Sequence, residues 1–320
     1  MSSRPVALAL AVFVTFLWST SWVLIKLGLD DLELPPLSFA GLRYVLAALI
    51  LLPLALPALR RVGPWRGSSR LLAGVAALGL LLYSLTQGAQ FAALAYLPAV
   101  AVALVLSTTP VLVGLLSLRN ERASRLQAMG VGMLVLGAAL YFGPFEFGES
   151  GVLGLTIALV GMGANALAAL LGRRLARDSV EQLGGVLSLT ALSMLVGSLA
   201  LLGSGLVVEG LPSLTPEAWL IIGWLALVNT ALAFTLWNQS LRTLTAVESS
   251  VINNLMLVQI AVLAWIFLGE ALNAVEILGL GLALAGILVV QLAPAVGRRA
   301  RRASHGLPSD AGGGAALGER

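Results

Sequence analysis

The chain contains no cysteine and a single histidine, His305, which lies near its C-terminal end. Without cysteine, no disulfide, thiolate nucleophile or cysteine metal site can form. An enzyme needs paired acids, metal ligands or a Ser–His set, and the apolar part of the chain has no histidine and few carboxylates. The sequence therefore predicts no enzyme, no metal site and no cofactor. No Walker A pattern occurs, so ATP is not a direct energy source.

Charge is scarce as well: charged residues make up 11% of the chain, against about 25% in a soluble domain. Hydrophobic residues make up 59%, and the mean hydropathy is +0.98. Such a chain cannot cover its surface with polar groups, so a lipid bilayer is its expected surroundings. Apolar runs of about 20 residues, long enough to cross a bilayer as a helix, recur along the chain. We predict an all-α integral membrane protein with ten transmembrane helices, at roughly 5–27, 36–58, 70–91, 95–117, 125–143, 151–172, 183–204, 217–238, 246–268 and 274–293.

The basic residues are distributed unevenly over these ten spans. With the N-terminus in the cytoplasm, 17 of the 19 Lys and Arg residues lie in cytoplasmic segments, and the other two, Lys26 and Arg43, lie within the first two spans. The outer segments carry only acidic charge. We therefore expect a multi-pass protein of the plasma (inner) membrane with both termini in the cytoplasm. The pI of 10.1 reflects this topology, and nucleic acid is not an expected partner.

Part of the sequence is duplicated. Glu121, Gly130, Gly132 and Gly137 recur 149 residues later as Glu270, Gly279, Gly281 and Gly286. Five spans per copy is an odd number, so the second copy would enter the membrane from the opposite side. The predicted architecture is two inverted five-helix repeats, with the first repeat at 1–145, the second at 146–293 and a disordered basic cytoplasmic tail at 294–320.

The matched residues have structural explanations. Glu121 and Glu270 each stand just before the next helix, where a carboxylate interacts favourably with the helix dipole. The six matched glycines are expected to let helices approach closely. Pro110 is expected to kink the fourth span and expose backbone carbonyls.

Several stretches together resemble the drug/metabolite transporter superfamily, EamA type, over about residues 6–293. They are "FLWSTSWVLIKLGL", "LSFAGLRYVLAALILL", "LAFTLWNQSLRTLTAVESSVINNL" and "LAWIFLGEALNAVEILGLGLALAGILVV". The resemblance implies ten helices, two EamA repeats and export of small metabolites or amino acids. The chain departs from the family pattern at Ser19, where glycine is usual, and at Leu257, where the second repeat lacks the counterpart of Pro110.

Polar side chains inside spans are the natural candidates for a substrate pathway. Trp18, Trp22 and Lys26 are spaced i, i+4 and i+8, so they share one helix face. The two indoles would form an apolar wall of a cavity with Lys26 near its outer mouth. The alternative is an interface aromatic and a lysine that reaches out to water.

Arg43 lies about seven residues into the second span. It is either an anchor for a substrate carboxylate, a partner for another helix, or a side chain that snorkels to the outer face. Tyr83, Gln87 and Gln90 form a stripe in the third span, which either lines a cavity or makes hydrogen bonds between helices.

The ninth span is the most polar. Asn253 and Asn254 share one broad face with two serines, and Glu248 and Gln259 lie nearly opposite. One face is expected to line the cavity and the other to bond to a neighbouring helix. Glu248 is the proton-coupling candidate, with an ordinary carboxylate at a helix N-terminus as the alternative. Asn165, Asn229 and Trp237 are weaker candidates for the site.

The sequence therefore predicts a secondary transporter that exports a small organic solute by alternating access between its two halves. Its expected partners are a small-molecule substrate and the lipid bilayer, and a homodimer is left open. The alternative function is a membrane receptor or lipid-binding scaffold without transport. The predicted substrate-binding residues are Trp18, Trp22, Arg43, Tyr83, Gln87, Gln90, Asn253 and Asn254.

Overall fold

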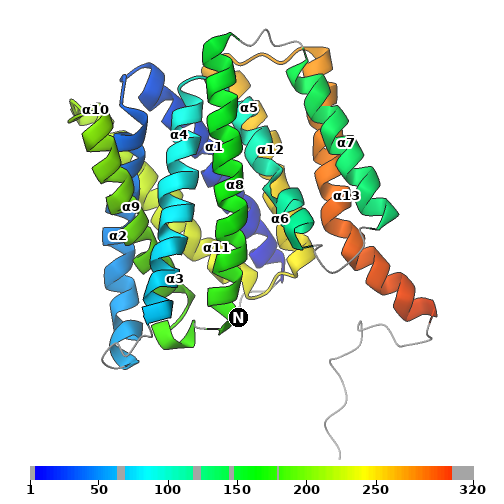
Figure 1. Cartoon of the computed structure of the whole chain (residues 1–320), viewed down its shortest axis with the longest axis horizontal. Coiled ribbons are helices and arrows are strands. Elements are labelled where there is room, and N and C mark those ends of the chain that lie inside the picture. The colour runs from blue at the N-terminus through cyan, green and yellow to red at the C-terminus, as the bar shows by residue number, and fades with distance from the viewer. Residues whose placement is uncertain (1–3, 63–68, 118–123, 144–147, 179, 305–320) are drawn as a thin grey trace, which may run out of the picture.

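A computed structural model describes residues 4–62, 69–117, 124–143, 148–178 and 180–304 (Figure 1). The described part is all helical and contains ten spans that are long and apolar enough to cross a membrane, which confirms the predicted number. The elements are α1 Arg4–Asp30, α2 Pro36–Arg61, α3 Ser69–Gly79, π-helix η1 Leu80–Thr86, α4 Gln87–Leu94, α5 Ala99–Ser107, α6 Thr109–Ser117, α7 Arg125–Phe142, α8 Glu149–Asp178, 3₁₀-helix η3 Glu181–Leu183, α9 Val186–Val208, α10 Pro216–Ala226, π-helix η4 Leu227–Leu232, α11 Ala233–Leu241, α12 Ala246–Leu268 and α13 Ala274–Ser304.

The helices begin at local signals in the sequence. The side chain of Thr215 accepts a hydrogen bond from the Ala218 amide, and a proline follows it at the first helical position of α10. Ser124 with Gln127 opens α7 through a reciprocal capping box, and Thr245 with Glu248 opens α12 in the same way. These side chains satisfy backbone amides that have no partner within their own helix.

The fourth span is broken at the predicted proline. Helix α5 ends at Ser107, Thr108 forms a turn, and α6 begins at Thr109. Pro110 cannot donate to the Leu106 carbonyl, and the Thr109 hydroxyl donates to that carbonyl instead at 2.6 Å. Leu257 stands at the corresponding position of α12, which is continuous.

The third and eighth spans each contain a π-helical turn. Segment η1 begins at Leu80 and η4 begins at Leu227, 147 residues later. The same 147 residues separate Pro98 and Thr245, which precede α5 and α12. The two π-helices therefore occupy corresponding places in the two halves of the chain, and such turns often mark functional sites.

The two halves of the chain are interleaved. Helix α2 packs along α9, α1 along α11 and α12, and α8 along α4, η1 and α6. Each of these contacts joins the first half to the second. At one side of the molecule α7 and α13 pack along each other, and α2, α9 and α10 lie at the opposite side (Figure 1).

Four of the six matched glycines lie where α7 meets α13, as predicted. A Cβ on Gly137 would overlap the Ala283 amide nitrogen. A Cβ on Gly279 would lie 2.5 Å from the amide nitrogen of Tyr141. Gly130 and Gly286 approach each other's helix in the same way. The packing prediction is wrong for Gly132 and Gly281, which are exposed and where an added Cβ would have no neighbour within 4 Å.

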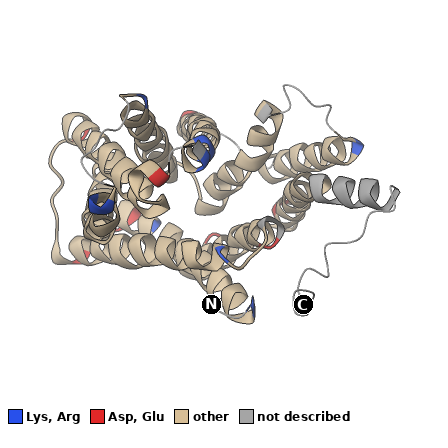
Figure 2. Ribbon diagram, turned by 90° about the horizontal axis from the view of Figure 1, so that it is seen from below, with Lys and Arg blue, Asp and Glu red and all other residues tan. Residues whose placement is uncertain are grey.

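We call the end of the bundle that carries the connection 31–35 the upper end, as in Figure 1, and the opposite end the lower end. The N-terminal end of α1 and the C-terminal end of α13 both lie toward the lower end (Figure 1). Seen along the bundle, the charged residues of the described part are scattered over a ribbon that is mostly tan (Figure 2). Helix α13 continues to Ser304, so residues 294–304 are helical rather than the predicted disordered tail.

Candidate functional site

A layer of polar and aromatic side chains lies inside the bundle, and we call it the polar layer. Its members come from α1, α2, η1, α4 and η4, two of which are the corresponding π-helices. The polar layer consists of Trp18, Arg43, Tyr44, Tyr83, Gln87, Asn229 and Thr230.

Arg43 is the charged member of the polar layer. It is only 3% exposed, and its Nε donates to the Thr230 hydroxyl at 3.2 Å. Its guanidinium lies 4.9 Å from the ring centre of Tyr44 and 5.9 Å from that of Phe91. Aromatic faces stabilise such a cation but do not neutralise it. Of the three sequence-based hypotheses, snorkelling to the outer face is therefore wrong, because the side chain points into the bundle.

Two more predicted residues meet next to Arg43. The Tyr44 hydroxyl donates to Oε1 of Gln87 at 2.7 Å, and the Tyr44 and Tyr83 rings lie 5.7 Å apart. Gln90, one turn further along α4, is also buried. The predicted stripe of Tyr83, Gln87 and Gln90 thus faces the bundle interior, with α2 supplying its polar neighbour.

Asn229 joins η4 to α1. Its amide nitrogen donates to the Leu17 carbonyl and, at 3.0 Å, to the Thr20 hydroxyl. Next along the chain, the Thr230 hydroxyl donates to the Leu225 carbonyl five residues earlier, as the wider π-turn permits. Thr86 makes the same i−5 bond, to Leu81, in η1.

The two tryptophans of α1 have different surroundings. Trp18 is half-buried, and its ring centre lies 5.5 Å from that of Phe234 and 5.2 Å from that of Trp237. These aromatic rings form an apolar wall beside η4. Trp22 is 5% exposed and packs in the main hydrophobic core.

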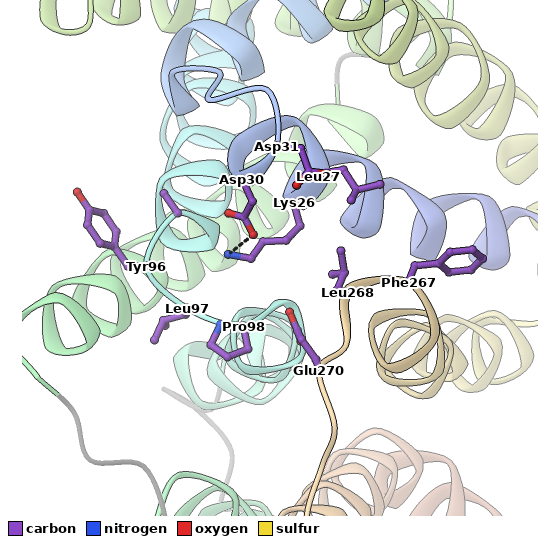
Figure 3. Close-up of a pocket in the computed structure, with 11 residues that line it drawn as sticks. Lys26, Leu27, Asp30, Asp31, Tyr96, Leu97, Pro98, Phe267, Leu268 and Glu270 are labelled. Carbon is purple, nitrogen blue, oxygen red and sulfur yellow. Dashed lines mark ion pairs between the residues drawn. The ribbon is translucent and has the colours of Figure 1, made fainter.

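A pocket of about 470 Å³ opens at the upper end of the bundle (Figure 3). It is lined by the end of α1, the connection before α5 and the end of α12. Lys26 donates to the Leu94 carbonyl at 2.8 Å and pairs with Asp30 at 3.2 Å. Asp31 and Glu270 also line the pocket, so its charged groups are one cation and three carboxylates. Lys26 thus lines a pocket, but neither Trp18 nor Trp22, the expected walls of the predicted cavity, lines it with Lys26.

Glu270 caps a different helix from the one expected. Its carboxylate accepts hydrogen bonds from the amides of Ala99 at 2.7 Å and Val100 at 3.3 Å, at the start of α5. Helix α13 is capped instead by Asn273 and Glu276. The attraction to a helix N-terminus was predicted correctly, but α5 rather than the next helix receives it. The matched Glu121 lies outside the described residues.

Glu209 makes a similar contact. Its two carboxylate oxygens accept from the amides of Leu37 and Ser38, at the start of α2, at 2.9 and 2.8 Å. Thus two carboxylates of the second half hold helix N-termini of the first half at the upper end.

The polar residues of α12 face several neighbours. Asn254 is buried and donates to Gln291 of α13 at 2.8 Å, whereas Asn253 is exposed. Gln259 accepts from Ser19 of α1 at 3.0 Å. Asn253 and Asn254 therefore lie apart from the polar layer in this conformation.

Glu248 lies in the first turn of α12, where it accepts from the Thr245 amide at 2.9 Å and from Nε of Arg4 at 3.1 Å. This geometry matches the helix-N-terminal carboxylate that the sequence offered as the alternative to proton coupling.

The structure thus brings together Arg43, Tyr83 and Gln87 around Tyr44, whereas Trp18 packs against Phe234 and Trp237 of α11. Sequence reasoning did not single out Tyr44 or Thr230, and it ranked Asn229 low. A tyrosine or threonine in a span is common, and Asn229 and Thr230 lie in a π-turn that hydropathy does not reveal.

Comparison with known proteins agrees with the fold. The sequence profile of the EamA-like transporter family matches residues 5–143 and 152–292. A protein of Salmonella typhimurium described as a probable amino-acid metabolite efflux pump is 27% identical over 309 residues, which cover 91% of this chain and 97% of that protein. A crystal structure with 20% sequence identity superposes with a TM-score of 0.61, covering 93% of this chain and 99% of that one, and supports the fold alone. The chain belongs to the EamA-like transporter family.

Proposed function

We propose that this protein is a secondary transporter that exports small metabolites, with amino acids as the leading class, by alternating access. The observation that supports the proposal best is the polar layer. It lies inside the spans, includes residues of the corresponding π-helices of the two halves, and contains a buried cation. A solute site near the bilayer midplane, between two repeats, is the arrangement expected of a secondary transporter. The Salmonella relative, described as an efflux pump, favours the outward direction.

The orientation and the repeat boundaries belong to the same proposal. Apart from Lys26 and Arg43, the basic residues of the described helices stand near the lower end, which we assign to the cytoplasm of a cell with the protein in its plasma membrane. Residues 1–145 and 146–293 would then be inverted repeats, and the pocket of Lys26 would open outward. The corresponding π-helices support this assignment.

The experiment is efflux from liposomes that contain the purified protein. The liposomes are loaded with a broad panel of amino acids and metabolites, and the retained solutes are quantified against protein-free liposomes. We expect faster loss of a subset of solutes, and loss of that rate in Gln87→Ala and Trp18→Ala. A protein that moves none of the panel would favour the alternative of a receptor or lipid-binding scaffold. Unchanged rates in both variants would remove the polar layer from the pathway.

A further inference from the structure

Two buried atoms of the polar layer have no hydrogen-bond partner among the described residues. They are Nη1 of Arg43, a donor, and Oδ1 of Asn229, an acceptor. Arg43 is 3% exposed and Asn229 is fully buried. Leaving such groups unpaired is unfavourable, so native structures rarely do so without a reason.

The two residues that carry the unpaired atoms meet at η4. Arg43 donates through Nε to Thr230, which directly follows Asn229 in η4. The other polar atom of Asn229, Nδ2, is already held by α1 through Leu17 and Thr20. Oδ1 is therefore the free end of a fixed amide, and Nη1 is the free end of a fixed guanidinium.

The charge of Arg43 is also unbalanced. No carboxylate of the described residues forms an ion pair with it, and its nearest groups are the Tyr44 and Phe91 rings and a hydroxyl. A buried cation without a counter-ion favours an anionic group strongly. A guanidinium binds a carboxylate through short, charge-assisted hydrogen bonds.

We propose that the polar layer binds a zwitterionic α-amino acid, with its carboxylate on Nη1 of Arg43 and its ammonium on Oδ1 of Asn229. This inference rests on the proposed function and names its substrate class. The carboxylate balances the charge of Arg43, and the ammonium supplies the donor that Oδ1 lacks. A simple amine would meet the positive charge of Arg43, and a simple acid would leave Oδ1 unpaired.

The site is closed in this conformation, because both atoms are buried. A solute can reach them only when the helices around η4 separate, as alternating access requires.

The test uses three solute mixtures in liposomes that contain the full-length protein. The first holds the twenty standard L-amino acids, the second their carboxamides and the third their N-acetyl derivatives. The carboxamides lack the carboxylate charge, and the N-acetyl compounds lack the ammonium. A site built to bond both groups should reject either analogue by at least about tenfold in efflux rate. Carboxamides or N-acetyl compounds that leave as fast as the amino acids would overturn the inference while leaving transport intact.

Variants assign each end of the solute. Arg43→Gln is expected to abolish the preference for amino acids over carboxamides, and Arg43→Lys to retain part of it. Asn229→Ala is expected to abolish the preference over N-acetyl derivatives. Gln291→Ala, a change at a half-buried amide of α13, is the matched control and should keep both preferences. Equal loss in the control would contradict the assignment.

A binding measurement separates the two proposals. The melting temperature of the detergent-purified protein is recorded with each mixture, since a ligand of the folded state raises it. If no mixture leaves the liposomes but amino acids alone raise the melting temperature, the site stands and the transport function fails. If amino acids change neither quantity, the site is rejected too.

Discussion

Arg43 carries its charge into the bundle about seven residues into the second span, where the cost is below the roughly 2.5–3.5 kcal/mol of an arginine at the helix centre. The Thr230 hydroxyl accepts one of its hydrogen bonds. Thr230→Val keeps the shape and removes that acceptor, so we expect a loss of about 1–3 kcal/mol in the free energy of unfolding. Thr86→Val is the control, because it removes the same i−5 bond in η1 without a contact to the guanidinium. Unfolding in denaturing detergent measures the free energy of unfolding of both variants. Equal losses of stability in the two would contradict a special role for Thr230.

The Glu270 carboxylate accepts its hydrogen bonds from two backbone amides rather than from a cationic side chain. Glu270→Gln replaces the charged acceptor at the start of α5 by a neutral one, and charge-assisted hydrogen bonds contribute about 1.5–3 kcal/mol. We expect a stability loss within that range in the same unfolding assay. Asp31→Asn removes a carboxylate from the same pocket that makes no side-chain hydrogen bond with the described residues, and it should change stability by less than about 0.5 kcal/mol. A comparable loss in Asp31→Asn would mean that pocket charge, not capping, is responsible.

Variants of Glu248 can show whether its carboxylate caps a helix or couples transport to protons. Its capping box with Thr245 and its ion pair with Arg4 account for its position. We therefore expect Glu248→Gln to lower stability by about 0.5–2 kcal/mol and to leave the pH dependence of transport unchanged. Efflux rates across a pH series in the variant and in Thr245→Ala, which disrupts the same cap, provide the measurement. A pH dependence lost only in Glu248→Gln would establish the proton-coupling role that the sequence suggested.

At the scale of elements, the contact between α7 and α13 depends on two helix backbones approaching each other at glycines. A methyl group on Gly137 would overlap the backbone of α13, and backbone cannot move as an exposed side chain can. Gly137→Ala is expected to destabilise the protein by about 1–3 kcal/mol through overpacking. Gly132→Ala, five residues away on the exposed face of α7, should be neutral or stabilise by up to about 1 kcal/mol. Thermal unfolding of the two variants measures the difference. A destabilising Gly132→Ala would show that the open face of α7 is covered in the membrane.

The π-helices explain why elements were easier to predict than the site. Hydropathy and length locate a span, but they do not reveal one extra residue in a helical turn. That extra residue rotates everything after it, so Tyr83 and Asn229 face partners that a regular helix would not give them. The predicted stripe of Tyr83, Gln87 and Gln90 nevertheless faces the interior, whereas Thr230 was not singled out although its neighbour Asn229 was a weak candidate.

For the whole molecule, the number of spans, the broken fourth span and the family resemblance followed from composition, Pro110 and repeated residues. Which helices and side chains contact each other did not follow from the sequence, because most tertiary contacts join the two halves across large sequence separations. Glu270 illustrates this: its affinity for a helix N-terminus is local chemistry, whereas the choice of α5 is set by packing. Gly132 and Gly281 illustrate the converse, since a repeated glycine can face away from the contact.

The orientation of the two halves can be decided with cysteines, because the chain has none of its own. Asp31 lies in the first connection of the first half, and Glu181 lies in the corresponding connection of the second half. If the halves are inverted with cytoplasmic termini, Asp31→Cys reacts with a membrane-impermeant maleimide in intact cells, and Glu181→Cys reacts only after lysis. Arg70→Cys, at the lower end of the first half, should behave like Glu181→Cys. Labelling of Asp31→Cys and Glu181→Cys from the same side would rule out inversion, and with it the two-fold relation that places the polar layer between the repeats. Exchange of the two results would keep the inversion and reverse the direction in which the pocket of Lys26 opens.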